Sequence, residues 1–169
     1  MRVLGIDPGS NCTGYGIVES DRKTLKSIHW GSIKSKSRTP FPERLKAIYD
    51  ELTRVIDEYR PEVVAIEDLF FAVNAQSTIK LGQTRGVALL AAVNANLAIA
   101  EYTPLEIKLS TVGYGRADKN QVRDMVTTLL RLKKKPEPLD ASDALAVAIC
   151  HLHNHGTSNR LKEALSSRR

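Results

Sequence analysis

Short apolar runs that end in a carboxylate constrain the fold of this 169-residue chain more than any other feature. Asp7 follows the apolar stretch 3–6, and Glu67 follows the apolar stretch 63–66. Continuous apolar runs of this length are typical of strands that are buried on both faces. If the two strands pair in parallel, their carboxyl ends meet, and Asp7 and Glu67 lie side by side at one edge of a sheet.

Two further carboxylates open an apolar run near the end of the sequence. Asp140 and Asp143 precede residues 144–149, and their spacing places both on one face of a helix, one turn from its start. If this helix packs its apolar face on the sheet, all four acids converge. Each acid also has an ordinary structural explanation, as a turn residue, a strand end that meets water or a helix cap.

The remaining sequence predicts alternating strands and helices. Strands at 2–7 and 13–19 flank a turn-forming run and make a hairpin, and a third strand covers 25–34. Apolar residues at intervals of three and four predict a helix from Pro42 that ends at Pro61. Beyond the strand at 63–66, we expect a long buried helix at 74–96 that also contacts a second subunit, a strand at 97–102, a loop at 111–116, and helices at 119–132 and from 140 to about 153.

This order of elements predicts an α/β fold with a mixed five-stranded sheet flanked by helices. We expect one domain, residues 1–155, followed by a flexible basic tail at 156–169. The two cysteines, Cys12 and Cys150, are isolated, which suggests neither a disulfide framework nor a thiolate metal site and fits a reducing cytoplasm. We expect no signal peptide, and no run is long and apolar enough to cross a bilayer.

The chain is basic, with 25 Lys and Arg against 19 Asp and Glu, a formal net charge of +6 and a pI of about 9.4. Between residues 108 and 135, eight basic residues stand against two acidic ones, which gives eight minus two, or +6, in this segment. Phosphate contacts dominate nucleic-acid affinity, so the segment is the leading candidate for binding a nucleic-acid backbone. The alternative is a solvated helix face followed by a basic loop. The basic residues are Lys108, Arg116, Lys119, Arg123, Arg131, Lys133, Lys134 and Lys135.

Carboxylates from several separate segments suit the hydrolysis of a phosphodiester. This reaction needs an activated water, an in-line approach and charge stabilisation at the leaving oxygen, and two Mg²⁺ ions about 4 Å apart supply all three. Mg²⁺ prefers oxygen ligands, and Mn²⁺ is expected to substitute for it. We therefore expect two Mg²⁺ ions to be held by Asp7, Glu67, Asp140 and Asp143.

Four parts of the sequence resemble the bacterial Holliday junction resolvases of the RuvC type, in the same order along the chain. They are Gly5-Ile6-Asp7-Pro8-Gly9-Ser10 with Thr13-Gly14-Tyr15-Gly16, Ile66-Glu67-x-x-Phe70, Lys80-Leu81-Gly82-Gln83-x-Arg85-Gly86, and Asp140-Ala141-Ser142-Asp143-Ala144-Leu145-Ala146. The resemblance implies an RNase H-like fold, a homodimer and Mg²⁺-dependent paired nicking of four-way DNA junctions in recombination and repair. It also implies products with 5′-phosphate and 3′-hydroxyl ends, and handover from a branch-migration complex of RuvA and RuvB.

The same resemblance assigns roles to individual residues. The catalytic acids that it implies are Asp7, Glu67, Asp140 and Asp143. It places Lys108 and Lys119 near the scissile phosphate, with Lys119 taking part in catalysis, and it makes Phe70 a contact to DNA bases. Further candidates for DNA contact are the polar and basic residues Asn74, Gln76, Ser77, Lys80, Arg85, Arg116 and Arg123.

Three other functions stay open at this stage. A module of the actin and sugar-kinase type also begins with a strand, an Asp and a Gly-rich turn, but it needs a chain about twice as long because nucleotide binds between two such units. A junction-binding protein without catalysis is the second alternative, although all four acids are present. The third is a nuclease of the same fold with another nucleic-acid substrate, because the same acids serve many substrates.

Overall fold

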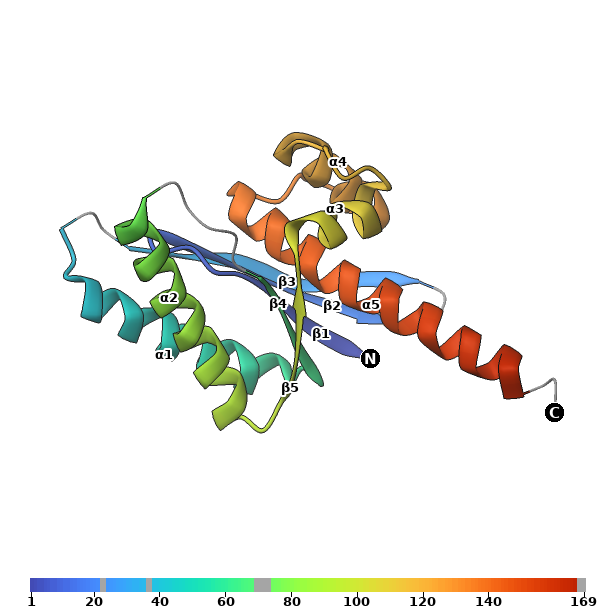
Figure 1. The fold of residues 1–169 in the computed structure, drawn as a ribbon, viewed down its shortest axis with the longest axis horizontal. Helices are drawn as coiled ribbons and strands as arrows, with labels where there is room; N and C mark the ends of the chain where they lie inside the picture. The colour runs from blue at the N-terminus through green and yellow to red at the C-terminus, as the bar shows by residue number, and fades with distance from the viewer. Residues whose placement is uncertain (22–23, 36–37, 69–73, 167–169) are drawn as a thin grey trace.

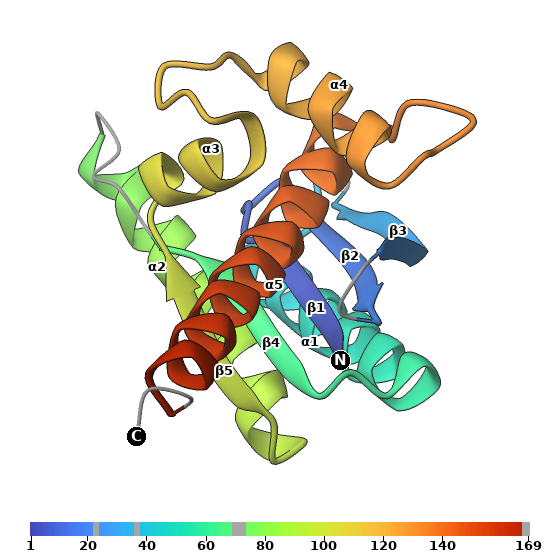
Figure 2. The ribbon, with the colours of Figure 1, turned by 90° about the vertical axis from the view of Figure 1, so that its right-hand side faces the viewer.

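The computed structural model describes residues 1–21, 24–35, 38–68 and 74–166, with side chains described as far as Thr157. In this part of the chain, one sheet runs through the middle of the molecule and helices cover both of its faces (Figures 1 and 2). The strands lie in the order β3 (Leu25–Lys34), β2 (Cys12–Ser20), β1 (Arg2–Asp7), β4 (Val63–Glu67) and β5 (Ala98–Tyr102). β3, β2 and β1 pair antiparallel, whereas β1, β4 and β5 pair parallel. The predicted hairpin and mixed five-stranded sheet are therefore confirmed.

α1 (Phe41–Tyr59) lies on one face of the sheet and follows the predicted apolar stripe. Its buried residues include Leu52 and Val55, which pack with the apolar side chains of the strands below. The helix ends where Arg60 adopts a left-handed backbone conformation, with φ of 48°, just before Pro61. A residue in this conformation at a helix end, followed by a proline, is a common way to stop a helix.

α2 (Ala75–Asn94) lies beside α1 on the same face, but it is not the buried helix that the sequence predicted. Ala88, Ala91 and Ala92 face the core, whereas Leu90 and Val93 are 52% and 58% exposed. The high apolar content of this helix therefore reflects two faces, one against the core and one in contact with solvent.

α3 (Pro104–Val112), α4 (Lys119–Leu129) and α5 (Leu139–Ser166) cover the opposite face of the sheet (Figure 2). The sequence pattern did not predict α3, which occupies the start of the expected loop at 111–116. A capping box between Thr103 and Glu106 begins this helix, and a Pro at its first position favours the helical backbone. None of the helices in the described residues is long and apolar enough to span a membrane.

Two predicted helix ends were wrong. α4 ends at Leu129 rather than at 132, and α5 continues to Ser166 rather than ending near His153. The segment after residue 156, expected to be a flexible basic tail, is thus helical as far as Ser166. Its residues 161–165 are Leu, Lys, Glu, Ala and Leu, all strong helix formers, so local propensity favours continuation of the helix.

Glycines on two neighbouring strands let α5 lie directly on the sheet. A Cβ atom on Gly5 would lie 2.0 Å from the carbonyl oxygen of Ala144, and one on Gly14 would lie 1.9 Å from that of Asp140. Gly5 is paired across the ladder with Gly16, where a Cβ would meet the side chain of Leu145 at 2.7 Å. The backbone of α5 thus reaches the strands themselves, which brings the first turns of the helix to the ends of β1 and β2.

Candidate active site

The parallel pairing of β1 and β4 places two of the predicted acids side by side. Ile6 is paired with Ile66, so Asp7 and Glu67 are the next residues on adjacent strands. Side chains alternate between the faces of a strand, and Asp7 therefore shares its face with Gly5, on which α5 packs. Both acids thus point toward the helix that carries the other two.

α5 brings Asp143 to this pair from the opposite layer. The charge of Asp143 acts on both Asp7 and Glu67, and its side chain is only 15% exposed. Asp140 lies one turn earlier, where its charge helps to raise the pKa of Asp143, and burial together with the Asp140 carboxylate raises the pKa of the Cys12 thiol to about 11. The structure therefore groups Asp7, Glu67 and Asp143 closely, with Asp140 on the side nearer β2.

Burial and neighbouring negative charge raise the pKa values of the three grouped acids. Burial raises the pKa of Asp7 well above the usual carboxyl range, and the charges of Glu67 and Asp143 raise it further. Burial also raises the pKa of Glu67 and of Asp143. The interaction between the Asp7 and Glu67 side chains raises the pKa of Asp7 and lowers that of Glu67. The group therefore retains a proton more readily than isolated acids would.

Two lysines provide positive charge at this acidic group. Lys119, the first residue of α4, places its Nζ 2.6 Å from Oδ2 of Asp143. Burial works to lower the pKa of Lys119, but the bond to Asp143 and the charges of Asp7 and Asp140 outweigh it and raise the pKa. Lys108, on α3, lowers the pKa values of Glu67 and Asp143. α3, which the sequence pattern did not predict, thus carries Lys108, a residue that the sequence analysis placed near the scissile phosphate.

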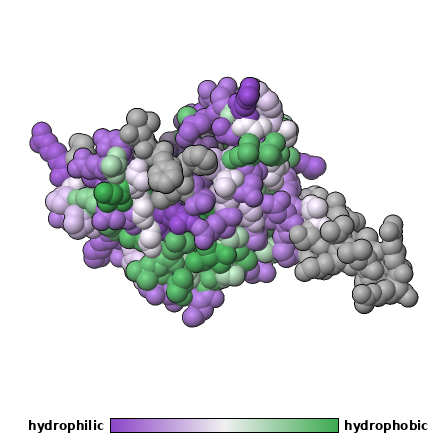
Figure 3. Space-filling view, viewed as in Figure 1, coloured by the Kyte–Doolittle hydropathy of each residue, from purple (hydrophilic) through white to green (hydrophobic). Residues whose placement is uncertain are grey.

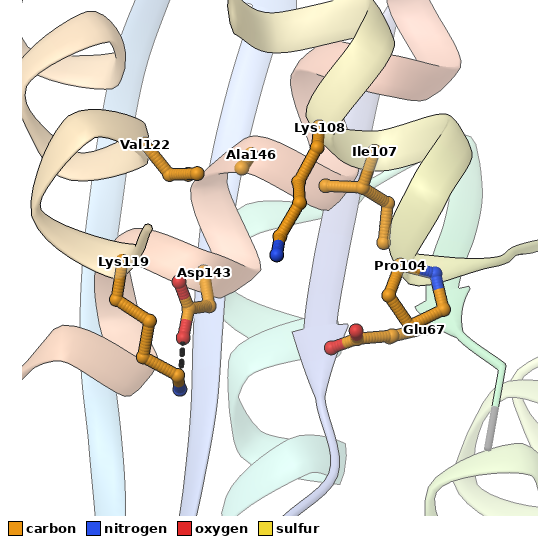
Figure 4. Close-up of a pocket in the computed structure, with 8 residues that line it drawn as sticks. All are labelled: Glu67, Pro104, Ile107, Lys108, Lys119, Val122, Asp143 and Ala146. Carbon is orange, nitrogen blue, oxygen red and sulfur yellow. Dashed lines mark hydrogen bonds and ion pairs between the residues drawn. The ribbon is translucent and has the colours of Figure 1, made fainter. Parts of the chain in front are cut away.

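A cavity of about 250 Å³ opens between these side chains (Figure 4). In Figure 4, Lys108 extends from α3 into the space between Asp143 and Glu67, and Lys119 approaches Asp143 from the other side. The wall of the cavity combines two carboxylates and two lysines with apolar groups from three helices. The lining residues are Glu67, Pro104, Ile107, Lys108, Lys119, Val122, Asp143 and Ala146.

No set of three or more His, Cys, Asp or Glu side chains in the described residues is arranged to hold a metal ion. The Lys119 ammonium instead occupies the place of a cation beside Asp143. Three carboxylates with raised pKa values are nonetheless a donor set that suits a hard divalent cation, because a bound cation would relieve their mutual repulsion.

The predicted DNA contacts fall into three groups. Phe70 lies outside the described residues. Asn74 caps α2 by accepting a hydrogen bond from the backbone N–H of Gln76 at 2.8 Å. Four further candidates are exposed: Gln76, Ser77 and Lys80 on the first turns of α2, and Arg116 in the loop before α4. Arg123 is half-buried and bonds Asn120 at 3.0 Å, and Arg85 forms ion pairs with Asp68 and Glu101.

Sequence reasoning missed two features that shape this site. The close approach of α5 depends on Gly5, Gly14 and Gly16, which the sequence showed only as parts of turn and strand patterns. α3 was also missed, although Thr103 and Glu106 had the spacing of a capping box. Reading that spacing would have placed Lys108 on a helix next to the acids.

Similar proteins point to the same chemistry. A family model described as crossover junction endodeoxyribonuclease RuvC matches residues 3–151. A relative of that name from Alkaliphilus oremlandii is 51% identical over 162 residues, covering 96% of this chain and 99% of the relative. Another, from Pelobacter propionicus, is 56% identical over 155 residues, covering 92% and 88%. The structure of Thermus thermophilus RuvC in complex with a Holliday junction substrate superposes with a TM-score of 0.87 at 33% identity, covering 94% of this chain and 96% of that one.

The sheet order, the acids at the ends of β1 and β4 and these matches define an RNase H-like nuclease fold. The chain belongs to the family of the crossover junction endodeoxyribonuclease RuvC. Its relatives are named as endodeoxyribonucleases, which hydrolyse DNA internally, and the expected fold and family are confirmed.

Proposed function

We propose that this protein resolves four-way DNA junctions by paired, metal-dependent nicking of opposite strands during recombination and repair. The observation that carries the proposal is the grouping of Asp7, Glu67 and Asp143 beside a cavity with Lys108 and Lys119, in a chain of the RuvC family. The products would be nicks with 5′-phosphate and 3′-hydroxyl ends, which a ligase can seal.

The carboxylates would hold two Mg²⁺ ions, and Mn²⁺ would substitute for them. We assign Asp7 to both ions, Glu67 to one, and Asp143 with Asp140 to the other. When bound, the ions would supply an activated water and neutralise charge at the leaving oxygen. The donor set supports this assignment, because buried acids whose pKa values are raised by burial and by neighbouring negative charge are stabilised by a nearby cation.

Lys119 would exchange its ion pair for a contact with the scissile phosphate. In the absence of DNA, its Nζ neutralises Asp143. A metal ion on Asp143 would compete with this ammonium, and the released side chain, which is 61% exposed, is long enough to turn toward the substrate. Lys108 would hold the same phosphate from the side of α3, since it extends into the cavity (Figure 4).

The junction arms would lie along polar and basic residues at the start of α2, on α4 and in the loop before α4. Phosphate contacts of this kind position DNA and make its binding dependent on salt. We assign these contacts to Asn74, Gln76, Ser77, Lys80, Arg116 and Arg123. Phe70 would contact the bases at the junction; it lies outside the described residues, and its role stays a prediction from sequence.

A second copy of the chain would cover the exposed face of α2. Ile79, Gly82, Gly86, Leu90 and Val93 recur at intervals of three and four residues, so they share one side of the helix. Ile79 is 61% exposed, and a Cβ on either glycine would meet no atom within 4 Å. Figure 3 shows apolar surface gathered over α2 and β5. A homodimer through this face would carry two active sites, one for each strand to be cut, and light scattering of Val93→Glu against the natural protein would test it.

The cellular setting follows from family membership alone. We infer that the protein works in the cytoplasm with the branch-migration proteins RuvA and RuvB. A pull-down from cell extract, with and without junction DNA, would test that association.

The substrate separates this proposal from its alternatives. We would incubate the protein with a mobile four-way junction, a linear duplex and an RNA/DNA hybrid of the same sequence, each with Mg²⁺, Mn²⁺ or EDTA. The proposal expects symmetric cuts in the junction only, dependent on the metal and resealed by ligase. Preferential cutting of the hybrid would overturn the junction assignment, and junction binding without cutting would indicate a non-catalytic binding protein.

A further inference from the structure

Arg85 connects α2 to the end of the strand that carries Glu67. Its Nη2 atom is paired with Asp68 at 3.4 Å and with Glu101 on β5. The Arg85 side chain is 16% exposed, whereas its two partners are 49% and 52% exposed. Arg85 is thus the shielded member of a three-residue cluster, although the sequence suggested that it contacts DNA.

The cluster lies on the face of the sheet opposite the acids. Glu101 is paired directly with Ile66, whose side chain belongs to the core under α1 and α2. Asp68 follows Glu67, and its backbone N–H donates to the Tyr102 carbonyl at 2.8 Å, so the chain here continues alongside β5. Successive side chains of an extended chain point to opposite faces, so Asp68 points toward α2 while Glu67 points toward α5.

The Arg85 guanidinium is held by ion pairs with Asp68 and Glu101, and not all of its N–H groups have a hydrogen-bond partner in the described part of the chain. The Nε atom of Arg85 is buried and has no hydrogen-bond partner among the described residues. A contact with a DNA phosphate would require the side chain to leave both Asp68 and Glu101. Asp68 and Glu101 would then lose their ion pairs with this guanidinium, behind an active site that already concentrates negative charge.

We propose that Arg85 is a positioning residue for the nuclease reaction and not a DNA contact. By fixing Asp68 and Glu101 on the α2 side, it fixes the peptide that joins Glu67 to Asp68 and so directs the Glu67 carboxylate toward Asp7. Arg85 also neutralises the two carboxylates that lie behind the acids. This inference rests on the proposed function, because it assigns Arg85 a part in the same site.

The test compares Arg85→Ala and Arg85→Lys with the natural protein. Partners of this kind, one step away from a metal ligand, typically change metal affinity or activity by about 10- to 100-fold. We expect Arg85→Ala to slow single-turnover cleavage of the junction by about this factor while the junction dissociation constant is unchanged. The Mn²⁺ concentration that raises the melting temperature should increase as well. Arg85→Lys should recover part of the rate, because an ammonium keeps the charge but cannot bridge two carboxylates as a planar guanidinium does.

Arg54 on α1 offers a matched control. It also joins two carboxylates, Glu51 and Glu58, but it lies on an exposed helix face with a side chain that is 51% exposed. Arg54→Ala should leave cleavage and the Mn²⁺ response unchanged. If Arg85→Ala does not yield folded protein, Glu101→Gln removes one charge of the cluster and should give a smaller loss in the same two measurements.

Two results would overturn the inference. Weaker junction binding by Arg85→Ala with a shallower salt dependence, at an unchanged cleavage rate of the bound complex, would make Arg85 a phosphate contact. A lower melting temperature with normal cleavage and a normal Mn²⁺ response would make it a brace of the fold alone. Failure of the proposed function would be distinct, because the natural protein itself would then not cut the junction.

Discussion

The two faces of the central sheet differ in the size of their side chains and in how closely helices approach them. On the α1 and α2 side, Leu4, Ile6 and Ile66 fill a thick apolar layer. On the α5 side, Gly5, Gly14 and Gly16 leave room for helix backbone to touch the strands. Large side chains bury the most apolar area, whereas glycines bury little and allow close approach. Both faces bury apolar side chains, but the first is filled by large side chains, whereas the second combines an apolar cluster with glycines that position the carboxylates.

The largest effect should come from a change on the α5 side that leaves the packing intact. Asp7→Asn keeps the shape of the side chain but removes a carboxylate that we assign to both metal ions. Metal ions contribute several kcal/mol of charge stabilisation, so we expect roughly a thousandfold slower cleavage. Gel-shift and single-turnover cleavage assays on one junction should show binding without cutting. Loss of both would mean that Asp7 mainly supports the fold.

A substitution that creates a cavity on the α1 and α2 side should lower stability and leave cleavage unchanged. Leu52 on α1 is fully buried, and Leu52→Ala should lower the free energy of unfolding by about 2–5 kcal/mol. The cleavage rate per folded molecule should not change, because Leu52 belongs to the apolar cluster under α1 and is a member of neither the acidic group nor the Arg85 cluster. Urea unfolding and an active-site-normalised cleavage assay would measure the two quantities. A fall in the normalised rate would show that packing under α1 also controls the position of the acids.

A third substitution should change stability and activity together. Gly5→Ala would place a Cβ 2.0 Å from the carbonyl oxygen of Ala144, so the α5 helix must move away from β1. Overpacking of this kind costs about 1–3 kcal/mol. It should also slow cleavage, since Asp143 moves with α5. Gly156→Ala is the control on the same helix: no atom lies within 4 Å of its Cβ, and it should be neutral or slightly stabilising. Equal effects of the two changes would contradict the close-packing argument.

The same contrast explains which features could be predicted from the sequence. Strand alternation and chain order depend on local patterns, so the hairpin, the parallel β1–β4 pair and the neighbouring positions of Asp7 and Glu67 followed from them. The contacts of Gly5 and Gly14 could not be read in this way, because a glycine's role depends on what packs against it. The same holds for Arg85, whose partners come from two other elements of the fold.

The limits of helix prediction have a different physical origin. α2 was predicted to be buried because its composition is apolar, but composition does not distinguish a core face from an exposed apolar face. α5 extends beyond the predicted end near His153 because strong helix formers follow in the sequence, so an end predicted from the apolar pattern comes too early.

The acidic group also predicts how stability changes with pH when no divalent cation is present. Burial and neighbouring negative charge raise the pKa values of Asp7, Glu67 and Asp143, so between the ordinary and the raised values the folded state binds protons that the unfolded chain releases. The free energy of unfolding should therefore fall as the pH rises from the ordinary values of 3.8 and 4.5 through the raised ones, with the loss complete above them. Thermal melts across this range should show a shallower fall for Asp7→Asn. Mg²⁺ should raise the melting temperature of the natural protein but not that of the variant, and a pH profile unchanged by the substitution would contradict this account.

The smallest expected change in the free energy of unfolding comes from a comparison of two ion pairs that have the same length. Lys119 with Asp143 and Lys135 with Asp124 are both 2.6 Å apart, but Asp143 is 15% exposed and Asp124 is 55% exposed. Exposed pairs contribute about 0–1 kcal/mol, because water screens them and ordering two long side chains costs entropy. Lys135→Met should therefore change the free energy of unfolding by less than about 1 kcal/mol. Lys119→Met should cost more in metal-free buffer, since it leaves Asp143 without its hydrogen bond among other acids, and Mg²⁺ should reverse part of that loss. If the two variants unfold at the same urea concentration with and without Mg²⁺, the Lys119 ammonium does not act as the cation of the metal-free site.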